Sequence, residues 1–164
     1  MDTTLALATG PKTAYVAEPA EASTRAVVVL HELLGLNDDI RRIADRFAAE
    51  GYRVVAPDLF EDLGRKPFCM ARAMAAMQTG GGPVLPVVGA VARHLRAAGA
   101  TGVGVAGFCM GGGFVLVLAA QQGDRIGAAV PFYGVGGYDE VDLSNVTAPV
   151  LGHFGSEDDF APPE

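Results

Sequence analysis

The sequence lacks the features of a nucleic-acid-binding, membrane-spanning or exported protein. It has 12 Lys and Arg against 19 Asp and Glu, a formal net charge of -7, and no basic cluster. Nucleic acids are bound by clustered cations that displace counterions, so this composition argues against such a partner. No apolar run is long enough to span a bilayer, and the start, MDTTLALATGPK, has neither the basic leader nor the apolar core of a secretory signal.

Cysteine is scarce as well, because Cys69 and Cys109 are the two in the chain. They form no CxxC motif and no Cys/His cluster at metal-ligand spacing, so we expect free thiols, a cytoplasmic protein and no bound metal. Cys69, in a methionine-rich segment, is interpreted as a packing residue. With 164 residues, of which half are hydrophobic, the chain can bury a sizeable core, and we expect a single domain over residues 1–164.

The order of the segments predicts the fold class. Short β-branched runs alternate with longer alanine-rich ones, which is typical of βα units. We expect strands over 26–32, 52–60, 101–107, 126–134 and 149–155, and helices over 68–78, 84–98 and 109–121. A further helix is capped by Asp38 or Asp39 and ends at Gly51. The prediction is an α/β fold with an open, mostly parallel sheet and helices on both faces.

In such a sheet, ligands bind in the crevice at the carboxyl ends of the strands. The residues that follow the predicted strands are Glu32, Asp58, Cys109, Tyr133 and Asp158. Glu32 follows an apolar run directly and must find a partner, either in catalysis or in a structural hydrogen bond to the neighbouring loop. Asp58 is interpreted as a turn residue. Asp158 lies in a run of three acidic residues, which is usually only solvated, but its place after a strand favours a function.

The segment Gly107-Phe108-Cys109-Met110-Gly111 has the form Gly-x-nucleophile-x-Gly at the end of a predicted strand. In a nucleophile elbow, such glycines leave room for a strained turn that lifts the nucleophile above the sheet. The helix that follows points its N-terminus at the thiol, which favours the thiolate and stabilises an oxyanion. The alternative is a small packing cysteine, which the glycine frame disfavours.

The same letters contain a second motif, because Gly102, Gly104 and Gly107 match the dinucleotide fingerprint GxGxxG. That fingerprint needs glycines that follow a strand and open a helix. Gly102 and Gly104 fall before or inside the predicted strand, so we do not expect nucleotide binding.

Four stretches together resemble the dienelactone hydrolase family of α/β-hydrolases, namely VVVLHELLGLNDDIRRIADRFAAEGY, VVAPDLF, GVAGFCMGGG and FGSEDDFAPP. The resemblance implies an α/β-hydrolase fold and a hydrolase of lactone or ester bonds with a Cys-His-Asp triad and no cofactor. The best-known activity of the family, carboxymethylenebutenolidase, opens dienelactone to maleylacetate. The expected partner is therefore a small-molecule lactone or ester.

The resemblance also implies site residues. Cys109 is the expected nucleophile, Asp158 the acid of the triad, and Glu32 the glutamate that contacts and helps to activate the thiol. The oxyanion donors of the family are the backbone N–H groups after that glutamate and after the nucleophile. In this chain they belong to Leu33 and Met110.

A base is missing at its expected place. In α/β-hydrolases a histidine follows the acid, whereas His31, His94 and His153 all precede Asp158. We interpret His31 and His153 as structural histidines at strand ends, with the alternative that one of them approaches Cys109 as the base. We therefore expect a C-terminally truncated domain that lacks the last helix-strand-helix segment and is nearly inactive. The alternative is a degenerate, non-catalytic module that binds an acyl compound or a protein partner.

The expected lack of a C-terminal segment also affects the last predicted strand. Without a covering segment, the strand over 149–154 has an apolar flank open to solvent. Such an edge predicts self-association.

Overall fold

The computed structural model describes residues 1–63, 68–122, 125–134 and 141–159. Six strands form one sheet in the order β1-β2-β4-β3-β5-β6. The strands β3 (Arg25–Leu30), β4 (Arg53–Pro57), β5 (Gly102–Phe108) and β6 (Ala128–Phe132) are parallel, and they follow the predicted strands closely. The continuous Val and Ala runs of these strands are buried on both faces of the sheet, as expected for parallel strands.

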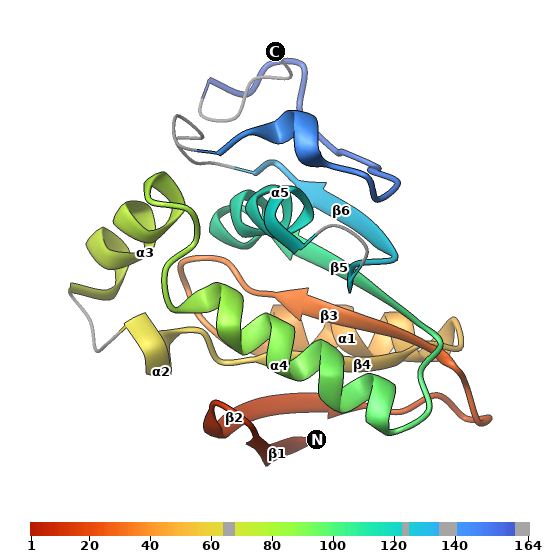
Figure 1. Ribbon diagram of the computed structural model, residues 1–164. Helices are drawn as coiled ribbons and strands as arrows, with labels where there is room; N and C mark the ends of the chain where they lie inside the picture. Colours follow the sequence, from red (N-terminus) through yellow and green to blue (C-terminus); the bar gives the residue numbers. More distant parts are fainter. Residues whose placement is uncertain (64–67, 123–124, 135–140, 160–164) are drawn as a thin grey trace.

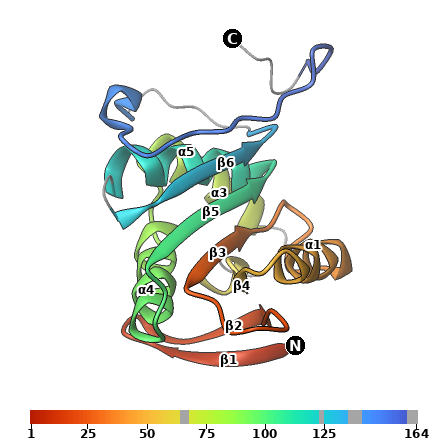
Figure 2. The ribbon, with the colours of Figure 1, turned by 90° about the vertical axis from the view of Figure 1, so that its right-hand side faces the viewer.

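Helices cover both faces, as predicted (Figures 1 and 2). The helix α1 (Asp38–Ala49) packs on one face, mainly against β4 and β2. The short α2 (Phe60–Leu63) leads to α3 (Phe68–Gln78), and α3, α4 (Val84–Ala97) and α5 (Met110–Gln122) lie on the other face. The core is accordingly divided into two hydrophobic clusters, one on each side of the sheet. None of the described helices is long and apolar enough to cross a membrane.

The N-terminal hairpin is not among the predicted strands. The strands β1 (Asp2–Leu7) and β2 (Gly10–Ala17) pair antiparallel, and β2 also pairs antiparallel with β4. Exposed and partly buried residues alternate along β1, because only one of its faces packs on the core. This alternation is a period-2 signal that prediction from continuous apolar runs overlooks.

The start of α1 corrects a prediction about capping. The N-cap is Asn37, not Asp38 or Asp39, because the Asn37 backbone is extended and its side-chain oxygen accepts the N–H of Ile40 at 3.0 Å. Asp38 and Asp39 lie in the first helical turn, where they form ion pairs with arginines one turn later. The predicted end of the helix at Gly51 agrees with the structure, where Glu50 is the C-cap.

The last predicted strand, 149–155, is shorter than expected. Two parallel bridges, Ala129 to Val150 and Phe132 to His153, place this segment beside β6. Backbone hydrogen bonds from Leu151 to Ala129 and from His153 to Pro131 hold it there. Before it lies a short 3-10 helix, η2 (Leu143–Asn145).

Candidate active site

Cys109 occupies the turn between β5 and α5, as its motif predicts. Its φ angle is +52°, a left-handed conformation that side chains other than glycine rarely adopt. A Cβ atom on Gly107 would lie 2.2 Å from the carbonyl oxygen of Gly111, so the turn closes on itself. The backbone N–H of Cys109 bonds to the Phe132 carbonyl oxygen at 3.1 Å, which fixes the turn to β6. The geometry is that of a nucleophile elbow.

The rival dinucleotide motif has no such geometry. Gly102 and Gly104 lie inside β5, where they are paired with Arg25 and Val27 of β3. Their backbone groups are therefore part of the sheet and are not free to cradle a phosphate. The predicted placement of these two glycines within the strand is confirmed.

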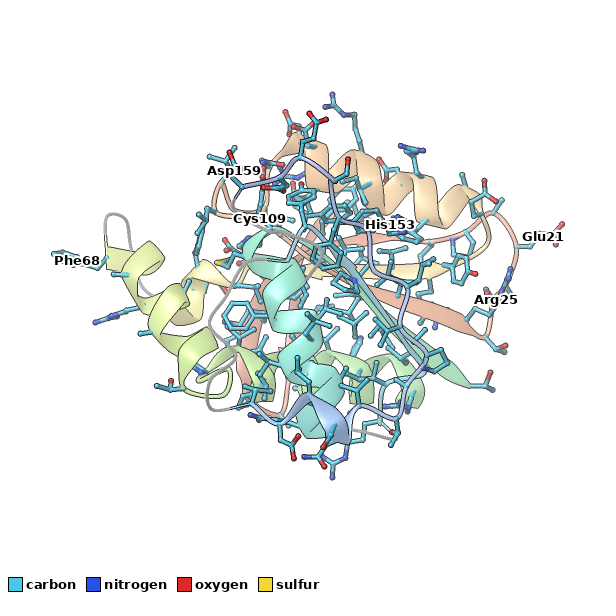
Figure 3. The ribbon with its side chains drawn as sticks, turned by 90° about the horizontal axis from the view of Figure 1, so that it is seen from above. Glu21, Arg25, Phe68, Cys109, His153 and Asp159 are labelled. Carbon is cyan, nitrogen blue, oxygen red and sulfur yellow. The ribbon has the colours of Figure 1, made fainter. Side chains whose placement is uncertain are left out.

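Two carboxylates lie within electrostatic reach of Cys109. Partial burial raises the pKa of the Cys109 thiol, and a hydrogen bond from the Met110 N–H to the sulfur lowers it. The negative charges of Glu32 and Asp158 raise the pKa further. At neutral pH the side chain is therefore a thiol, and not the thiolate that the helix N-terminus was expected to favour, because burial outweighs the Met110 N–H. The three predicted site residues lie together at one end of the sheet. Figure 3 shows this end, with Cys109 far from Arg25 at the start of β3.

Glu32 is held by a residue that the sequence did not single out. It is partly buried after β3, and its Oε1 atom accepts a hydrogen bond from the Asn37 side-chain amide at 3.4 Å. Because Asn37 also caps α1, the position of Glu32 is linked to the start of that helix. The sequence signal that could have found Asn37 is an amide side chain, which both donates and accepts hydrogen bonds, directly before the predicted helix.

The two predicted oxyanion donors differ in how firmly they are fixed. Met110 is the first residue of α5, and its side chain is completely buried. Its N–H group is therefore held in place at the sulfur. Leu33 is partly buried and follows Glu32 directly in the loop after β3. The strand β3 is the neighbour of β5, which leads to Cys109.

His31 has a structural role, as expected. It is fully buried, and its Nε2 atom accepts the N–H of Leu59 at 2.9 Å. The ring proton is thus assigned to Nδ1, which lies 2.7 Å from the Glu32 carbonyl oxygen. Both ring nitrogens are engaged, so His31 is not available to Cys109. The neighbouring Asp58 accepts the Phe60 N–H, which agrees with its predicted role in a turn.

The other two histidines are both exposed. His94 lies near the end of α4. The His153 ring stacks on Phe132, with ring centroids 4.3 Å apart, and Phe132 stacks in turn on Phe108 at 4.7 Å. Although all three histidines belong to the described residues, none of them contributes to the shift of the Cys109 pKa.

A cavity of about 560 Å³ opens beside this turn. Glu32, Phe108 and Tyr133 line it from the ends of β3, β5 and β6, and Ile40 and Ile43 of α1 line it as well. Arg42 and Arg46 of α1 and Asp39 complete its lining. The cavity is lined by apolar and charged side chains in equal number, and it contains the Glu32 carboxylate and lies beside the turn that holds Cys109. A carboxylate beside a thiol on such a turn is a setting for acyl transfer.

Other chemistries have less support in the described part of the chain. Among residues 1–63, 68–122, 125–134 and 141–159, no group of three His, Cys, Asp or Glu side chains is placed to hold a metal ion. The other cysteine, Cys69, lies in α3, but its side chain is outside the described structure, so its predicted packing role stays a prediction.

Comparison with known proteins gives matches over nearly the whole chain. The model of the Dienelactone hydrolase family matches residues 13–164. The protein usf of Aquifex pyrophilus is 32% identical over an alignment of 154 positions that covers 89% of this chain and 66% of that protein. A carboxymethylenebutenolidase of Pseudomonas putida is 28% identical over an alignment of 162 positions that covers 91% of this chain and 67% of that enzyme. The chain thus spans about two thirds of the length of these curated relatives.

Solved structures agree with these matches. A Klebsiella pneumoniae protein, whose crystal structure is described as a candidate dienelactone hydrolase, has a TM-score of 0.80 and 26% identity. The match covers 99% of this chain and 74% of that one. The dienelactone hydrolase-like phosphotriesterase P91, from metagenomic libraries, has a TM-score of 0.74 at 22% identity, which shows the same fold, and covers 99% of this chain and 72% of that one.

Proposed function

The chain belongs to the dienelactone hydrolase family, and on this premise we propose that it attacks lactone or ester bonds with Cys109 as the nucleophile. The observation that carries the proposal is the left-handed backbone of Cys109 between β5 and α5. A non-glycine residue in this conformation costs about 1 to 3 kcal/mol, which is retained where the strained turn serves the chemistry. The carboxymethylenebutenolidase of Pseudomonas putida supports a lactone as the substrate.

The first chemical step is acylation of the thiol. Glu32 accepts the proton of the Cys109 thiol, and the sulfur attacks the carbonyl carbon of the ester to form a C–S bond. The N–H groups of Met110 and Leu33 stabilise the oxyanion that develops on the carbonyl oxygen. The bond to the alcohol oxygen then breaks, Glu32 returns the proton to that oxygen, and a thioester on Cys109 remains.

The second step is hydrolysis of this thioester by water. Asp158 is the acid of the triad, whose role is to orient a base. His31 is engaged through both ring nitrogens, and neither His94 nor His153 contributes to the shift of the Cys109 pKa. We therefore propose that the 164-residue chain acylates much faster than it deacylates.

The test uses p-nitrophenyl acetate with the 164-residue chain. We expect a burst of p-nitrophenolate close to one equivalent of protein, slow turnover afterwards, and one acetyl group on Cys109 by peptide mass spectrometry. Cys109→Ala should abolish the burst, whereas Cys69→Ala is the matched control and should retain it. A burst that survives in Cys109→Ala, or a Cys109 that resists acylation in the folded chain, would refute the nucleophile assignment.

A further inference from the structure

Tyr133, directly after β6, has an unusual backbone. Its φ angle is +38°, and among the described residues only Tyr133 and Cys109 have a positive φ without being glycine. The two residues follow neighbouring parallel strands, β6 and β5. A bulky side chain in this conformation is strained, and strain of this kind persists where the surroundings hold it in place.

The surroundings of Tyr133 tie its backbone to the nucleophile turn. Its N–H bonds to the carbonyl oxygen of His153 at 2.7 Å, and the preceding carbonyl, of Phe132, accepts the N–H of Cys109. A Cβ atom on Gly112 of α5 would lie 2.7 Å from that same carbonyl oxygen. The turn after β6 therefore rests on the first turn of α5, and the position of Tyr133 relative to Cys109 is fixed.

The side chain of Tyr133 is not used for packing in the core. It is 39% exposed, and among the described residues its hydroxyl makes no hydrogen bond. It lines the cavity that also contains Glu32, with its ring 6.5 Å from the Phe108 ring, centroid to centroid. Burial raises the pKa of the Tyr133 hydroxyl, as do the charge of Glu32 and that of Cys109 once its thiol is ionised, so the Tyr133 side chain is neutral at physiological pH.

The position of the ring indicates which part of a substrate it meets. In a thioester intermediate, the acyl group stays bonded to Cys109 after the alcohol has left. A wall near the sulfur therefore contacts the acyl group both before and after the first step. Phe108 and Tyr133 present aromatic surface to the cavity, and Ile40 and Ile43 of α1 also line it. The rest of the lining is charged and consists of Glu32, Asp39, Arg42 and Arg46. Flat rings pack favourably on aromatic side chains.

We propose that Tyr133 is a specificity-determining residue whose ring forms one side of the acyl subsite beside Cys109, and that this subsite selects flat aryl acyl groups over saturated rings of similar size. The inference rests on the proposed function, because it assumes that Cys109 is acylated. The inference predicts that the protein distinguishes between acyl groups of similar size and different shape.

The experiment compares p-nitrophenyl benzoate with p-nitrophenyl cyclohexanecarboxylate, which share a leaving group and differ in the flatness of the acyl ring. The measured quantity is the second-order rate constant of the p-nitrophenolate burst. Tyr133→Leu should lower the preference for benzoate about 3- to 10-fold relative to the wild type. Tyr133→Asn, whose side chain tolerates a positive φ, should give the same loss if Tyr133→Leu does not fold. Tyr133→Phe keeps the ring and should keep the preference.

Two controls separate recognition from reactivity and from general damage. Alkylation of Cys109 by iodoacetamide, which needs no acyl subsite, should change less than about twofold in all Tyr133 variants. Phe68→Ala removes an exposed aromatic side chain of α3 that lies away from Cys109 in Figure 3, and should leave the preference unchanged. An unchanged preference in both Tyr133→Leu and Tyr133→Asn would overturn the inference and leave the proposed function standing. A wild type that p-nitrophenyl acetate acylates but neither ring ester does would overturn the inference alone, and a wild type that none of the three esters acylates would overturn both.

Discussion

Cys109 stands in surroundings that oppose its own ionisation. Burial and the negative charges of Glu32 and Asp158 raise its pKa, and the Met110 N–H offsets only part of this effect. The sign follows directly, because a thiol whose pKa lies above its ordinary value is protonated at neutral pH and is alkylated faster as the pH rises. A nucleophile of this kind must lose its proton during the reaction itself. Glu32 is then both the charge that disfavours the resting thiolate and the group that accepts the proton.

Substitution of Glu32 should therefore move two rates in opposite directions. Glu32→Gln removes a negative charge from the surroundings of Cys109, so its pKa falls and alkylation by iodoacetamide at pH 7 rises about two- to tenfold, as for a pKa change of up to one unit. Acylation by p-nitrophenyl acetate should fall instead, because the proton acceptor is gone. The measurement is both rates as a function of pH, from pH 6 to pH 10.

The control for this substitution is Asp159→Asn. It removes an exposed carboxylate that does not contribute to the shift of the Cys109 pKa, so both rates should stay at the wild-type values. If Glu32→Gln accelerates both alkylation and acylation, then Glu32 acts on the thiol only through its charge. Its role as proton acceptor would be wrong in that case.

At the scale of elements, β3, β5 and α5 meet through their backbones at the nucleophile turn. A Cβ atom on Gly111 would lie 2.4 Å from the carbonyl oxygen of Leu30, whereas one on Gly102 would meet nothing within 4 Å. Helix propensity alone predicts that Gly111→Ala stabilises the protein by about 1 kcal/mol. The clash with a backbone atom predicts the opposite sign, because the backbone of β3 must shift to make room.

We expect the clash to prevail. Gly111→Ala should lower the free energy of unfolding by about 3 kcal/mol, which for a chain of this length lowers Tm by about 6 to 12 °C. Gly102→Ala, at the start of β5, should stay within about 0.5 kcal/mol of the wild type. Thermal unfolding followed by circular dichroism distinguishes the two. A Gly111→Ala protein as stable as Gly102→Ala would show that this close approach is absent in solution.

The same elements show what local sequence can predict. The strands β3 and β5 and the helix α3 follow from the sequence, because each is a long apolar or alanine-rich segment bounded by clear breaks. The hairpin of β1 and β2 was missed because only one of its faces is buried, so its apolar residues alternate with polar ones. Asn37 was passed over for Asp38 and Asp39 because all three are good capping residues, and only the extended backbone of Asn37 distinguishes it.

Some features of the site can likewise be predicted from local sequence, and others cannot. The glycines around Cys109 predict a strained turn, and the structure has one at this position. The link between Glu32 and Asn37 is local, because the residues are five positions apart, but it depends on the path of the loop between them. The approach of Asp158 to Cys109 and the cavity wall at Tyr133 depend on the order of strands in the sheet. That order arises from packing between distant segments, which no local pattern encodes.

At the scale of the whole molecule, the two faces of the sheet are covered unequally. On the side of α3, α4 and α5, helices pack along the described sheet from β1 to β6 (Figure 1). On the other side, α1 packs against β2, β4 and β3. Beside it runs a groove of about 290 Å³, lined by Phe47 and Tyr52 and by small residues of β5 and β6. The segment 149–154 runs beside β6 at the edge of the described sheet (Figure 2). Val150, Leu151 and Phe154 of this segment are exposed, so the edge carries apolar surface.

We propose that this edge is where the 164-residue chain self-associates. Val150, Leu151 and Phe154 are 46%, 60% and 37% exposed, and alternate backbone groups of an edge segment point away from its neighbouring strand.

Leu151→Lys places a charge on the edge and should weaken association about tenfold, as expected for the loss of one buried leucine side chain. Sedimentation velocity over a range of protein concentrations measures the change. Leu143→Lys, which alters a leucine of η2 with 40% exposure outside the edge, is the matched control and should associate like the wild type. A wild type that stays monomeric at all concentrations, or equal association by the two lysine variants, would mean that the edge is not an interface, since a charge at a buried contact must cost more than the same charge in solvent.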